Sequence, residues 1–383
     1  MKKTSNTNYI LTGATGILGS HIMYELMLNI HNNDYKGKLV LLLRSKKDAS
    51  YVARFNELFN EEIIPDYLKN VDLDRIRQNN VTLIDFDLRY YHELDLKNSL
   101  GGDKYHLIHC AASVNLGSNA YAFEEIRNNN YLGTLNLIHA LHSRLTKVSY
   151  ISTAFSLSSK NGKTFESNDF RNDEDFRNYY EKYKVQTEQE VCEICDVYGL
   201  PTQIFRPSII CGRLVDYPYH VIPKFLVFYM FGAFFYRAKQ TCANQRVRIL
   251  MDATSGLNLI PVDYAAKAIV RALNTNIKEL NVVSQKSVPN TVTIPEMLRL
   301  VGWNDYEFIE EMPTDQNQVE KLYYRTVGAQ LNNYLTTPQS EDSHFNTKVL
   351  SELMKDFGEP RVEAHFSDLC SYAVDRGFNN ILA

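Results

Sequence analysis

The sequence predicts an α/β fold: a doubly wound parallel sheet with a smaller, partly interleaved substrate domain towards the C-terminus. Two observations predict it. Near-continuous apolar runs alternate with amphipathic helical patterns through the first 280 residues, and strands of that kind belong to parallel sheets covered by helices on both faces. After about residue 207 the alternation loosens, and residues 213–256 become rich in aromatic side chains.

The individual elements follow in chain order. Tyr9–Thr12 is the first expected strand, and apolar residues at positions 17, 18, 22, 23, 26, 27 and 30 then mark a helix with one buried stripe. Residues 39–43 form a fully apolar second strand. Further segments continue the series, the last of them with a weaker pattern: 81–86, 106–111, 148–152, 201–205 and 279–284.

The breaks in this pattern suggest domain boundaries. Residues 1–212 are expected to form the nucleotide-binding domain, and residues 257–285 resume strand and helix patterns that return to it. Residues 213–256 and 286–383 are assigned to a substrate-binding domain at the carboxyl edge of the sheet, where doubly wound folds place their ligands.

The composition excludes several classes of partner. The net charge of −4 and the pI near 6.2 leave no basic stripe for nucleic acid. No apolar h-region follows MKKTSNTNY, and the longest apolar stretch, residues 225–236, is shorter than the about 20 residues of a membrane helix. We therefore expect no membrane span, and residues 225–236 are interpreted as a buried or pocket-lining helix.

The six cysteines show no disulfide framework. Cys192 and Cys195 form a C-x-x-C near the end of a predicted helix, with neither a second pair nor histidines at matching spacing. A zinc site needs such additional ligands, so no metal site is expected. Scattered free cysteines favour a reducing, cytoplasmic location.

A glycine-rich segment joins the first strand to the first helix. Gly13, Gly16 and Gly19 have the spacing G-x-x-G-x-x-G. In such a loop the first glycine permits a tight turn, the second lets the backbone approach a pyrophosphate, and the third allows close helix–strand packing. The helix N-terminus then faces the anion. The segment predicts a Rossmann-type dinucleotide site.

The end of the second strand indicates which dinucleotide binds. Sites for NAD usually carry Asp or Glu there, as a partner for the ribose 2′-hydroxyl. This strand ends instead in Leu43-Arg44-Ser45-Lys46-Lys47. Arg44 can pair with a 2′-phosphate and stack on adenine. The cofactor is therefore expected to be NADP(H).

A Tyr-x-x-x-Lys pair, Tyr180 and Lys184, opens the helix that runs to about residue 198. The spacing places both side chains on one helical face. A nearby ammonium is expected to lower the tyrosine pKa, so that the phenol can exchange a proton as hydride moves. The preceding strand ends at Thr153, whose hydroxyl, or failing that the hydroxyl of Ser152, could bond a substrate carbonyl.

With these motifs the chain resembles the extended short-chain dehydrogenase/reductases, and within them the thioester reductase and fatty acyl-CoA reductase branch. The matching segments span most of residues 9–285 in the expected order: TGATGILGSH, LLLR, DFDL (85–88), HCAASVN (109–115), NYLGTLNLI (130–138), YISTAF (150–155), YEKYKVQTE (180–188), IFRPSIICG (204–212) and NLIPVDYAAKAIV (258–270). Phe86 stands where the branch usually has glycine, and the last hundred residues carry no matching motif.

The resemblance implies roles for individual residues. Thr153, Tyr180 and Lys184 would form the catalytic trio. Asp87 and Leu88 would border the adenine, Ala111 and Ala112 would flank the cofactor, and Pro207 and Ser208 would lie by the nicotinamide. The remaining residues expected to bind the cofactor are Gly13, Thr15, Gly16, Ile17, Leu18, Gly19, Arg44 and Arg54.

The resemblance also implies a reaction. An acyl thioester on coenzyme A or a carrier protein would be reduced by NADPH to an aldehyde, and whether a second NADPH then reduces the aldehyde to an alcohol stays open. Residues 225–236, with Tyr217 and Tyr219 nearby, would line an acyl channel unless they only build a tyrosine-rich core. Two alternatives stay open: a dehydrogenase for a nucleotide sugar, sterol-like alcohol or flavonoid-like ketone, and a non-catalytic NADP(H) sensor.

Overall fold

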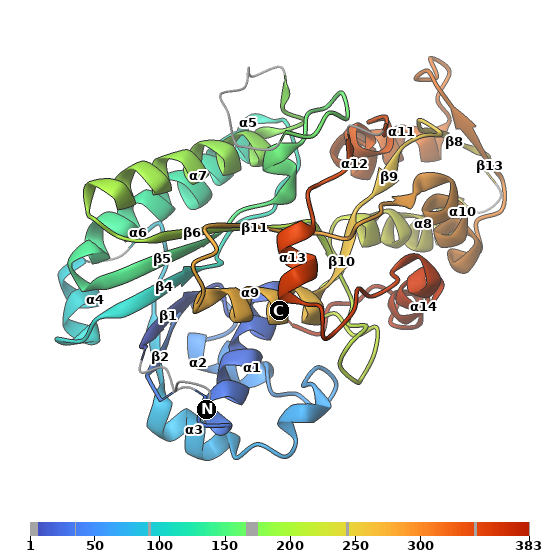
Figure 1. Ribbon diagram of the computed structural model, residues 1–383. Helices are drawn as coiled ribbons and strands as arrows, with labels where there is room; N and C mark the ends of the chain where they lie inside the picture. The colour runs from blue at the N-terminus through green and yellow to red at the C-terminus, as the bar shows by residue number, and fades with distance from the viewer. Residues whose placement is uncertain are drawn as a thin grey trace.

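The computed structural model describes residues 7–34, 36–90, 93–165, 175–242, 245–340 and 343–382. Its centre is a seven-stranded parallel sheet with the strand order β11-β6-β5-β4-β1-β2-β3 (Figure 1). The strands are β1 (Tyr9–Thr12), β2 (Leu39–Leu43), β3 (Val81–Asp85), β4 (Tyr105–His109), β5 (Leu145–Ile151), β6 (Thr202–Pro207) and β11 (Glu279–Val282). All seven expected strands are confirmed, including the weakest, residues 279–284.

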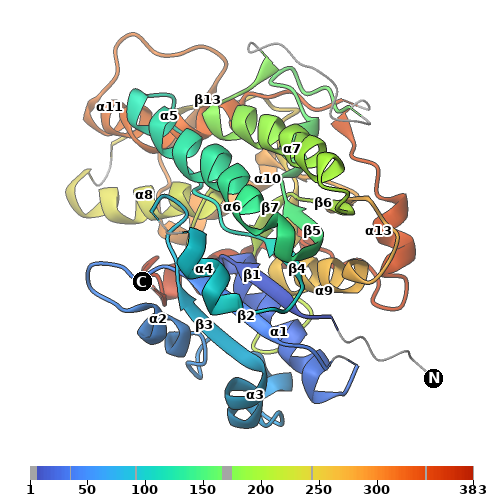
Figure 2. The same ribbon diagram turned by 90° about the vertical axis from the view of Figure 1, so that its left-hand side faces the viewer.

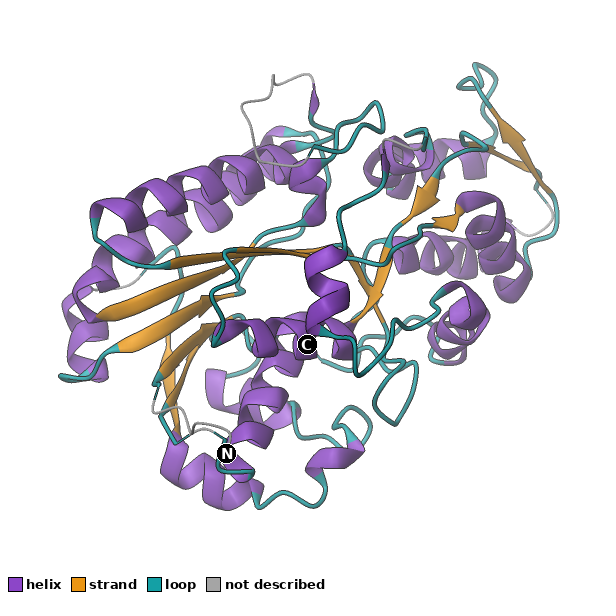
Figure 3. Ribbon diagram, in the orientation of Figure 1, coloured by secondary structure: helices purple, strands orange, loops and turns teal. Residues whose placement is uncertain are grey.

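Helices cover both faces of this sheet, because its strands are apolar on both sides (Figures 2 and 3). In β2 the side chains alternate: Leu39, Leu41 and Leu43 join one core and Val40 and Leu42 the other. One face carries α1 (Ile17–His31), α2 (Tyr51–Glu57), α3 (Leu73–Asn80) and α9 (Val262–Leu273). The other carries α4 (Glu93–Leu100), α5 (Ala120–Ile126), α6 (Gly133–Leu141) and α7 (Tyr179–Val197).

The order of the strands fixes where a ligand can bind. The chain moves outwards from β1 to β2 and β3 on one side, and from β4 to β11 on the other. In such sheets the crevice lies beyond the carboxyl ends of the strands where the direction reverses. Here that point lies between β1 and β4, where Thr12 pairs with His109.

A second core lies beyond this edge, on the right of Figure 1. It is built from α8 (Phe228–Cys242), α10 (Asn290–Val301), α11 (Gln318–Arg325), α12 (Val327–Leu335) and α14 (Phe366–Asp375). Short strand pairs accompany these helices: β7 (Ile209–Cys211) with β10 (Leu259–Pro261), β9 (Gly256–Leu257) with β12 (Val288–Pro289), and β8 (Val247–Leu250) with β13 (Tyr306–Ile309).

The C-terminal stretch does not stay within this second core. Leu350, in α13 (Lys348–Leu353), and Met354 just after it belong to the core that α1 and α9 share. The predicted boundaries, residues 1–212 with 257–285 against 213–256 with 286–383, remain a prediction. Within the described ranges, no helix combines the length and apolar character needed to cross a membrane.

Candidate active site

Two adjoining cavities open at the carboxyl edge of the sheet, with Gly13, Gly16, Cys110, Ala112 and Lys224 lining both. The first, called the Arg44 groove, has a volume of about 250 Å³. The second, called the Tyr180 cavity, has a volume of about 370 Å³. Every residue expected at the site lines one or both: Gly13, Thr15, Gly16, Ile17, Leu18, Gly19, Arg44, Arg54, Asp87, Leu88, Ala111, Ala112, Thr153, Tyr180, Lys184, Pro207 and Ser208.

The loop between β1 and α1 forms a backbone cradle. Gly13 has a φ of +74°, and a Cβ on it would lie 2.7 Å from the Ala111 nitrogen. A Cβ on Gly19 would lie 2.1 Å from the Gly13 oxygen. The fold itself therefore requires glycine at these two positions. A Cβ on Gly16 would meet only the Gly13 oxygen at 3.1 Å, so Gly16 leaves space for a phosphate at the N-terminus of α1.

Buried hydrogen bonds fix the end of β4 beside this loop. The Thr12 hydroxyl lies 2.9 Å from His109 Nδ1 and accepts from the backbone N–H groups of Cys110 and Ala111 at 3.1 and 3.0 Å. His109 Nε2 lies 2.9 Å from the Thr134 hydroxyl. Burial lowers the pKa of His109 to about 3, so the neutral imidazole holds the loop and does not act as an acid.

The Arg44 groove is lined by four cationic side chains: Arg44, Lys46, Arg54 and Lys224. Arg54 donates to the Thr15 hydroxyl at 2.8 Å and to the carbonyl oxygen of Arg44. Burial and the neighbouring Arg44 lower the pKa of Arg54. Burial and the charges of Arg54 and Arg44 likewise lower the pKa of Lys46. The groove therefore suits an anion.

One carboxylate, Asp87, also lines this groove. It accepts from Arg89 Nη2 at 2.7 Å and lies 3.7 Å from Arg44 Nη1. The hydrogen bond from Arg89 holds the pKa of Asp87 below its usual value. Asp87 is thus ionised and already engaged by arginines. At the end of β2 itself the side chain is Arg44, as the sequence shows, and not the carboxylate of NAD sites.

Helix α7 brings the Tyr180 and Lys184 side chains to the end of β5. The Asn178 side chain caps the helix by accepting from the Glu181 N–H at 3.0 Å. Lys184 Nζ donates to the Ile151 carbonyl at 2.8 Å and lies 6.0 Å from the centre of the Tyr180 ring. The four-residue spacing does place both side chains in one cavity.

The expected lowering of the Tyr180 pKa is wrong for this structure. Burial raises the pKa of the Tyr180 phenol well above its usual range, and the charges of Glu181 and Cys110 add to the rise. Burial also lowers the pKa of Lys184 to about 8. At neutral pH Tyr180 is therefore a protonated phenol, which can donate a hydrogen bond.

Three hydroxyl groups line the Tyr180 cavity near this pair. The Thr153 hydroxyl accepts from the Phe155 N–H at 3.4 Å and donates to the Pro207 carbonyl at 3.5 Å, both long bonds. The Ser152 and Ser208 hydroxyls are buried and have no hydrogen-bond partner within the described ranges. Buried hydroxyls of this kind usually bind water or a ligand. Both predicted donors, Thr153 and Ser152, therefore line the cavity.

Apolar side chains form most of the rest of the Tyr180 cavity: Val114, Leu116, Phe155, Ile209, Ile210, Ile222, Leu226, Val227 and Tyr334. Leu226 and Val227 come from the apolar stretch 225–236. Tyr217 and Tyr219 do not line the cavity. Their side chains are 59% and 50% exposed, and their rings pack edge to face, 5.7 Å apart. The expectation that these two tyrosines flank an acyl channel is wrong.

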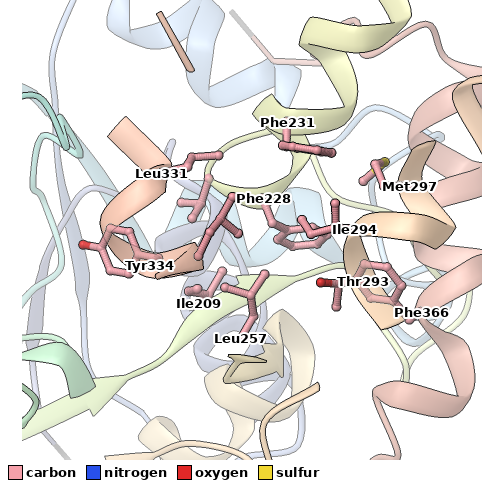
Figure 4. Close-up of a pocket in the computed structure, with 12 residues that line it drawn as sticks. Ile209, Phe228, Phe231, Leu257, Thr293, Ile294, Met297, Leu331, Tyr334 and Phe366 are labelled. Atoms are coloured by element: carbon pink, nitrogen blue, oxygen red, sulfur yellow. The ribbon is translucent and has the colours of Figure 1, made fainter. Parts of the chain in front are cut away.

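A smaller pocket of about 20 Å³, called the apolar pocket, shares Ile209, Val227 and Tyr334 with the Tyr180 cavity. Figure 4 shows its lining, in which the Tyr334 hydroxyl points away from the other side chains. The other polar side chain in the lining, Thr293, donates to Asn290 at 3.2 Å. A lining of this composition keeps such a pocket dry.

A buried ion pair at the start of α7 is hydrogen-bonded to a residue of the second core. Arg177 Nη1 lies 3.1 Å from Glu181 Oε1, and these side chains are 2% and 0% exposed. The Tyr334 hydroxyl of α12 donates to Glu181 at 2.8 Å and accepts from Asn178 at 2.8 Å. The first turn of α7 is thereby held against α12, which places the Tyr334 ring in the wall of the cavity.

A group of residues with metal-ligand chemistry lies outside both cavities. His220, His365 and Asp368 bring one ligand atom each within 4.8 Å of the others. His220 is half-buried, whereas His365 and Asp368 are exposed. None of the three lines the Arg44 groove or the Tyr180 cavity, so we assign this group no role in the reaction.

Several residues of the site could not be expected from motifs. Lys46, Cys110, Lys224 and Tyr334 line the cavities without belonging to the expected set. The sequence offered a signal for two of them: Lys46 lies two residues after Arg44, and Cys110 lies inside the HCAASVN segment. Lys224 and Tyr334 come from regions without motifs, so only the folded chain reveals them.

Comparisons with known proteins agree with this geometry. The family model described as male sterility protein, an NAD-binding family, matches residues 11–269. The isonitrile lipopeptide synthase of Mycobacterium tuberculosis is 27% identical over 230 residues, which are 54% of this chain. The chain spans only 8% of the length of that relative.

Two solved structures share the fold. The terminal R domain of the myxalamid PKS-NRPS pathway is 19% identical with a TM-score of 0.70, covering 99% of this chain and 93% of that one. The thiolation-reductase di-domain of an archaeal non-ribosomal peptide synthetase is 19% identical with a TM-score of 0.65, covering 98% and 77%. The chain belongs to the male sterility protein family, which includes the thioester reductases, and is an NAD(P)-dependent oxidoreductase with the extended short-chain dehydrogenase/reductase fold.

Proposed function

We propose that this protein uses NADP(H) to reduce an acyl thioester to an aldehyde, with Tyr180 as the proton donor. The observation that carries the proposal is the lining of the Tyr180 cavity. Beyond the catalytic and cofactor-side residues it is apolar, and its charged side chains are Lys184 and Lys224. An acyl chain suits such a wall, whereas a nucleotide sugar needs polar partners for its diphosphate and hydroxyls.

The residues around the Arg44 groove fit a dinucleotide. Gly16 leaves space for the pyrophosphate at the N-terminus of α1, and Ala111 and Ala112 follow β4 along the same groove. When bound, the nicotinamide supplies the hydride. Arg44, Lys46 and Arg54 favour a ligand that carries the additional 2′-phosphate of NADP(H). The carboxylate that lines the groove with them, Asp87, already accepts from Arg89.

The protein's own groups stabilise the reacting carbonyl. Tyr180 donates a hydrogen bond to the carbonyl oxygen, and Thr153, or Ser152, supplies a second donor from the end of β5. Negative charge develops on that oxygen as the carbonyl carbon accepts hydride, and donors already in place stabilise it without reorganisation. Lys184, held by the Ile151 carbonyl, would hold the ribose of the bound cofactor and keep a positive charge near the oxygen.

Each thioester that is reduced gains one hydride and one proton. The carbonyl carbon gains a hydride, the oxygen gains a proton from Tyr180, and the resulting hemithioacetal loses its thiol to give the aldehyde. A second round on the aldehyde would give an alcohol. Both solved relatives are reductase domains of PKS-NRPS or NRPS systems, and one is joined to a thiolation domain. These relatives support a carrier-bound substrate, with coenzyme A esters as the other source of the thioester.

The test follows NADPH consumption and free thiol together, with acyl-CoA esters and acylated carrier proteins of several chain lengths. We expect one thiol per acyl group reduced, and at least a hundredfold loss of rate in Tyr180→Phe. Tyr183→Phe is the matched control, because Tyr183 lies on the same helix and packs on Phe123 outside the cavity. Undiminished thiol release in Tyr180→Phe would remove the proposed donor.

The same assay separates the alternative functions. Oxidation of an alcohol by NADP⁺ without thiol release would favour a dehydrogenase for sugars, sterols or ketones. Binding of NADPH without turnover of any substrate class would favour a sensor. The presence of Thr153, Tyr180 and Lys184 in one cavity speaks against the sensor.

A further inference from the structure

Lys224 lies where the two cavities meet, although it belongs to neither the glycine loop nor the catalytic helix. It follows β7 on the segment 212–227, which leads into α8. Ile222, Leu226 and Val227 of this segment line the Tyr180 cavity, whereas Lys224 lines both that cavity and the Arg44 groove. One short segment therefore supplies part of the apolar wall and a cation at the cofactor side.

The surroundings of Lys224 are positive. Burial, together with the charges of Lys46 and Arg54, lowers the pKa of Lys224 to about 8, and Glu57 offsets only part of this effect. Arg54 is held in place by its hydrogen bond to Thr15 in the glycine loop. Cations gathered around one partly buried groove repel each other, and a bound phosphate relieves that repulsion.

The backbone on either side of Lys224 is fixed by residues near the C-terminal end of the described chain. The Pro223 carbonyl accepts from the backbone N–H groups of Ile381 and Leu382 at 3.0 and 3.3 Å. The Phe225 N–H donates to the Asn380 side chain at 2.9 Å. Lys224 is therefore presented to the groove from a backbone that other parts of the fold hold in place.

We propose that Lys224 binds a phosphate of the dinucleotide cofactor, and that Asn380 positions it for this contact. Lys224 shares the junction with Gly13 and Gly16, so the pyrophosphate is the expected partner and the 2′-phosphate the other phosphate in reach. The inference rests on the proposed function only for the class of cofactor. Its consequence is that the wall of the acyl site and the cofactor site share one segment of chain.

The experiment measures binding of NADPH and NADH to the full chain by calorimetry, without any acyl substrate. Lys224→Gln should weaken NADPH binding at least tenfold, while Lys224→Arg, which keeps the charge, should stay within about threefold of the wild type. The difference between wild type and Lys224→Gln should shrink in high salt. Asn380→Ala should weaken binding by a smaller factor. If Lys224→Gln loses affinity for NADPH and NADH equally, the partner of Lys224 is the pyrophosphate. If it loses affinity for NADPH alone, the partner is the 2′-phosphate.

Lys47→Gln is the matched control, because it removes the same charge from an exposed position that lines neither cavity. It should change the affinity less than twofold, and thermal unfolding of every variant checks that it is folded. Unchanged NADPH affinity in a folded Lys224→Gln protein would overturn the inference and leave the proposed reductase intact. Failure of the wild type to bind NADPH would instead overturn the proposed function.

Discussion

Tyr180 and Lys184 are neighbours on one helix, yet burial raises the pKa of Tyr180 and lowers the pKa of Lys184. The neutral form is favoured in both cases, so the phenol keeps its proton and the ammonium loses its proton more easily. The proposed catalytic pair is therefore composed of a phenol that stays protonated at neutral pH and an ammonium group whose pKa of about 8 lies close to neutral pH. For a reduction this is a suitable arrangement, because the reaction consumes a proton at the carbonyl oxygen.

The charge of Lys184 should make kcat/KM depend on pH. Lys184 carries its positive charge below its pKa of about 8 and loses it above that value. If the ammonium supports hydride transfer, kcat/KM should be steady from about pH 6 to 7 and fall as the pH rises through about 8. The measurement is kcat/KM for a thioester across pH, with stability of the protein checked at each pH.

Two variants make this profile decisive. In Lys184→Arg the charge persists to high pH, so the fall near pH 8 should disappear even if the overall rate is lower. In Lys184→Met the rate should be low at all pH values and show no fall near 8. A fall of the same shape in Lys184→Arg would mean that another group titrates.

The residue scale also shows what motifs can and cannot predict. The Tyr180–Lys184 pair and the glycines at 13, 16 and 19 were predictable, because each is set by spacing within one local segment. The raised pKa of Tyr180 was not, because it comes from surroundings that only the folded chain provides. Lys224 was not either, since its place beside Arg54 depends on contacts between residues 223–225 and 380–382.

At the scale of elements, α7 and α12 act together. The Arg177–Glu181 pair, the Tyr334 hydroxyl and the Asn178 side chain bond to one another across the two helices. Arg177 also donates to the Ser158 hydroxyl at 3.0 Å and to the Ser159 carbonyl at 2.6 Å. The buried charges are therefore well paired, and the orientation of α7 depends on a residue of the second core.

A double-mutant cycle measures how strongly the Arg177 and Glu181 side chains interact. Arg177→Met leaves the Glu181 carboxylate buried without its partner and should lower the free energy of unfolding by about 3–5 kcal/mol. The double variant Arg177→Met/Glu181→Gln should lose less than the sum of the single variants, because no buried charge is then left unpaired. Urea unfolding measures all four proteins. Strict additivity would show that the two side chains do not interact.

The elements themselves were largely predictable. All seven strands of the sheet and the helix of residues 17–30 occur where alternation of apolar runs and amphipathic patterns predicted them. The strand expected at the start of residues 257–285 forms as β10, but it pairs with β7 and not with the main sheet. Pairing partners of such short strands depend on long-range packing, which the local pattern does not encode. Residues 286–383 carried no matching motif, and the packing of their helices likewise depends on long-range contacts.

At the scale of the whole molecule, the second core closes the catalytic edge of the sheet. Its residues Val227 and Tyr334, together with Ile209, line both the Tyr180 cavity and the apolar pocket, and so form a wall that the two cavities share. Figure 4 shows Ile209 and Tyr334 in this lining. If an acyl chain lies in the Tyr180 cavity, this wall limits its length. Val227 is also strained, because it is β-branched and has a φ of +54°.

Val227→Gly tests this limit. Glycine adopts a positive φ without steric cost, so the substitution removes strain together with three carbon atoms of the wall. The Tyr180 cavity should then join the apolar pocket, and the preferred acyl chain should lengthen by about two to three carbons, matching the volume removed. The measurement is kcat/KM for a series of saturated acyl thioesters.

Met297→Ala is the control, because of the two cavities Met297 lines only the apolar pocket. This variant should lower stability and leave the preference for chain length as it was. An unchanged preference in Val227→Gly would show that the acyl chain does not reach this wall.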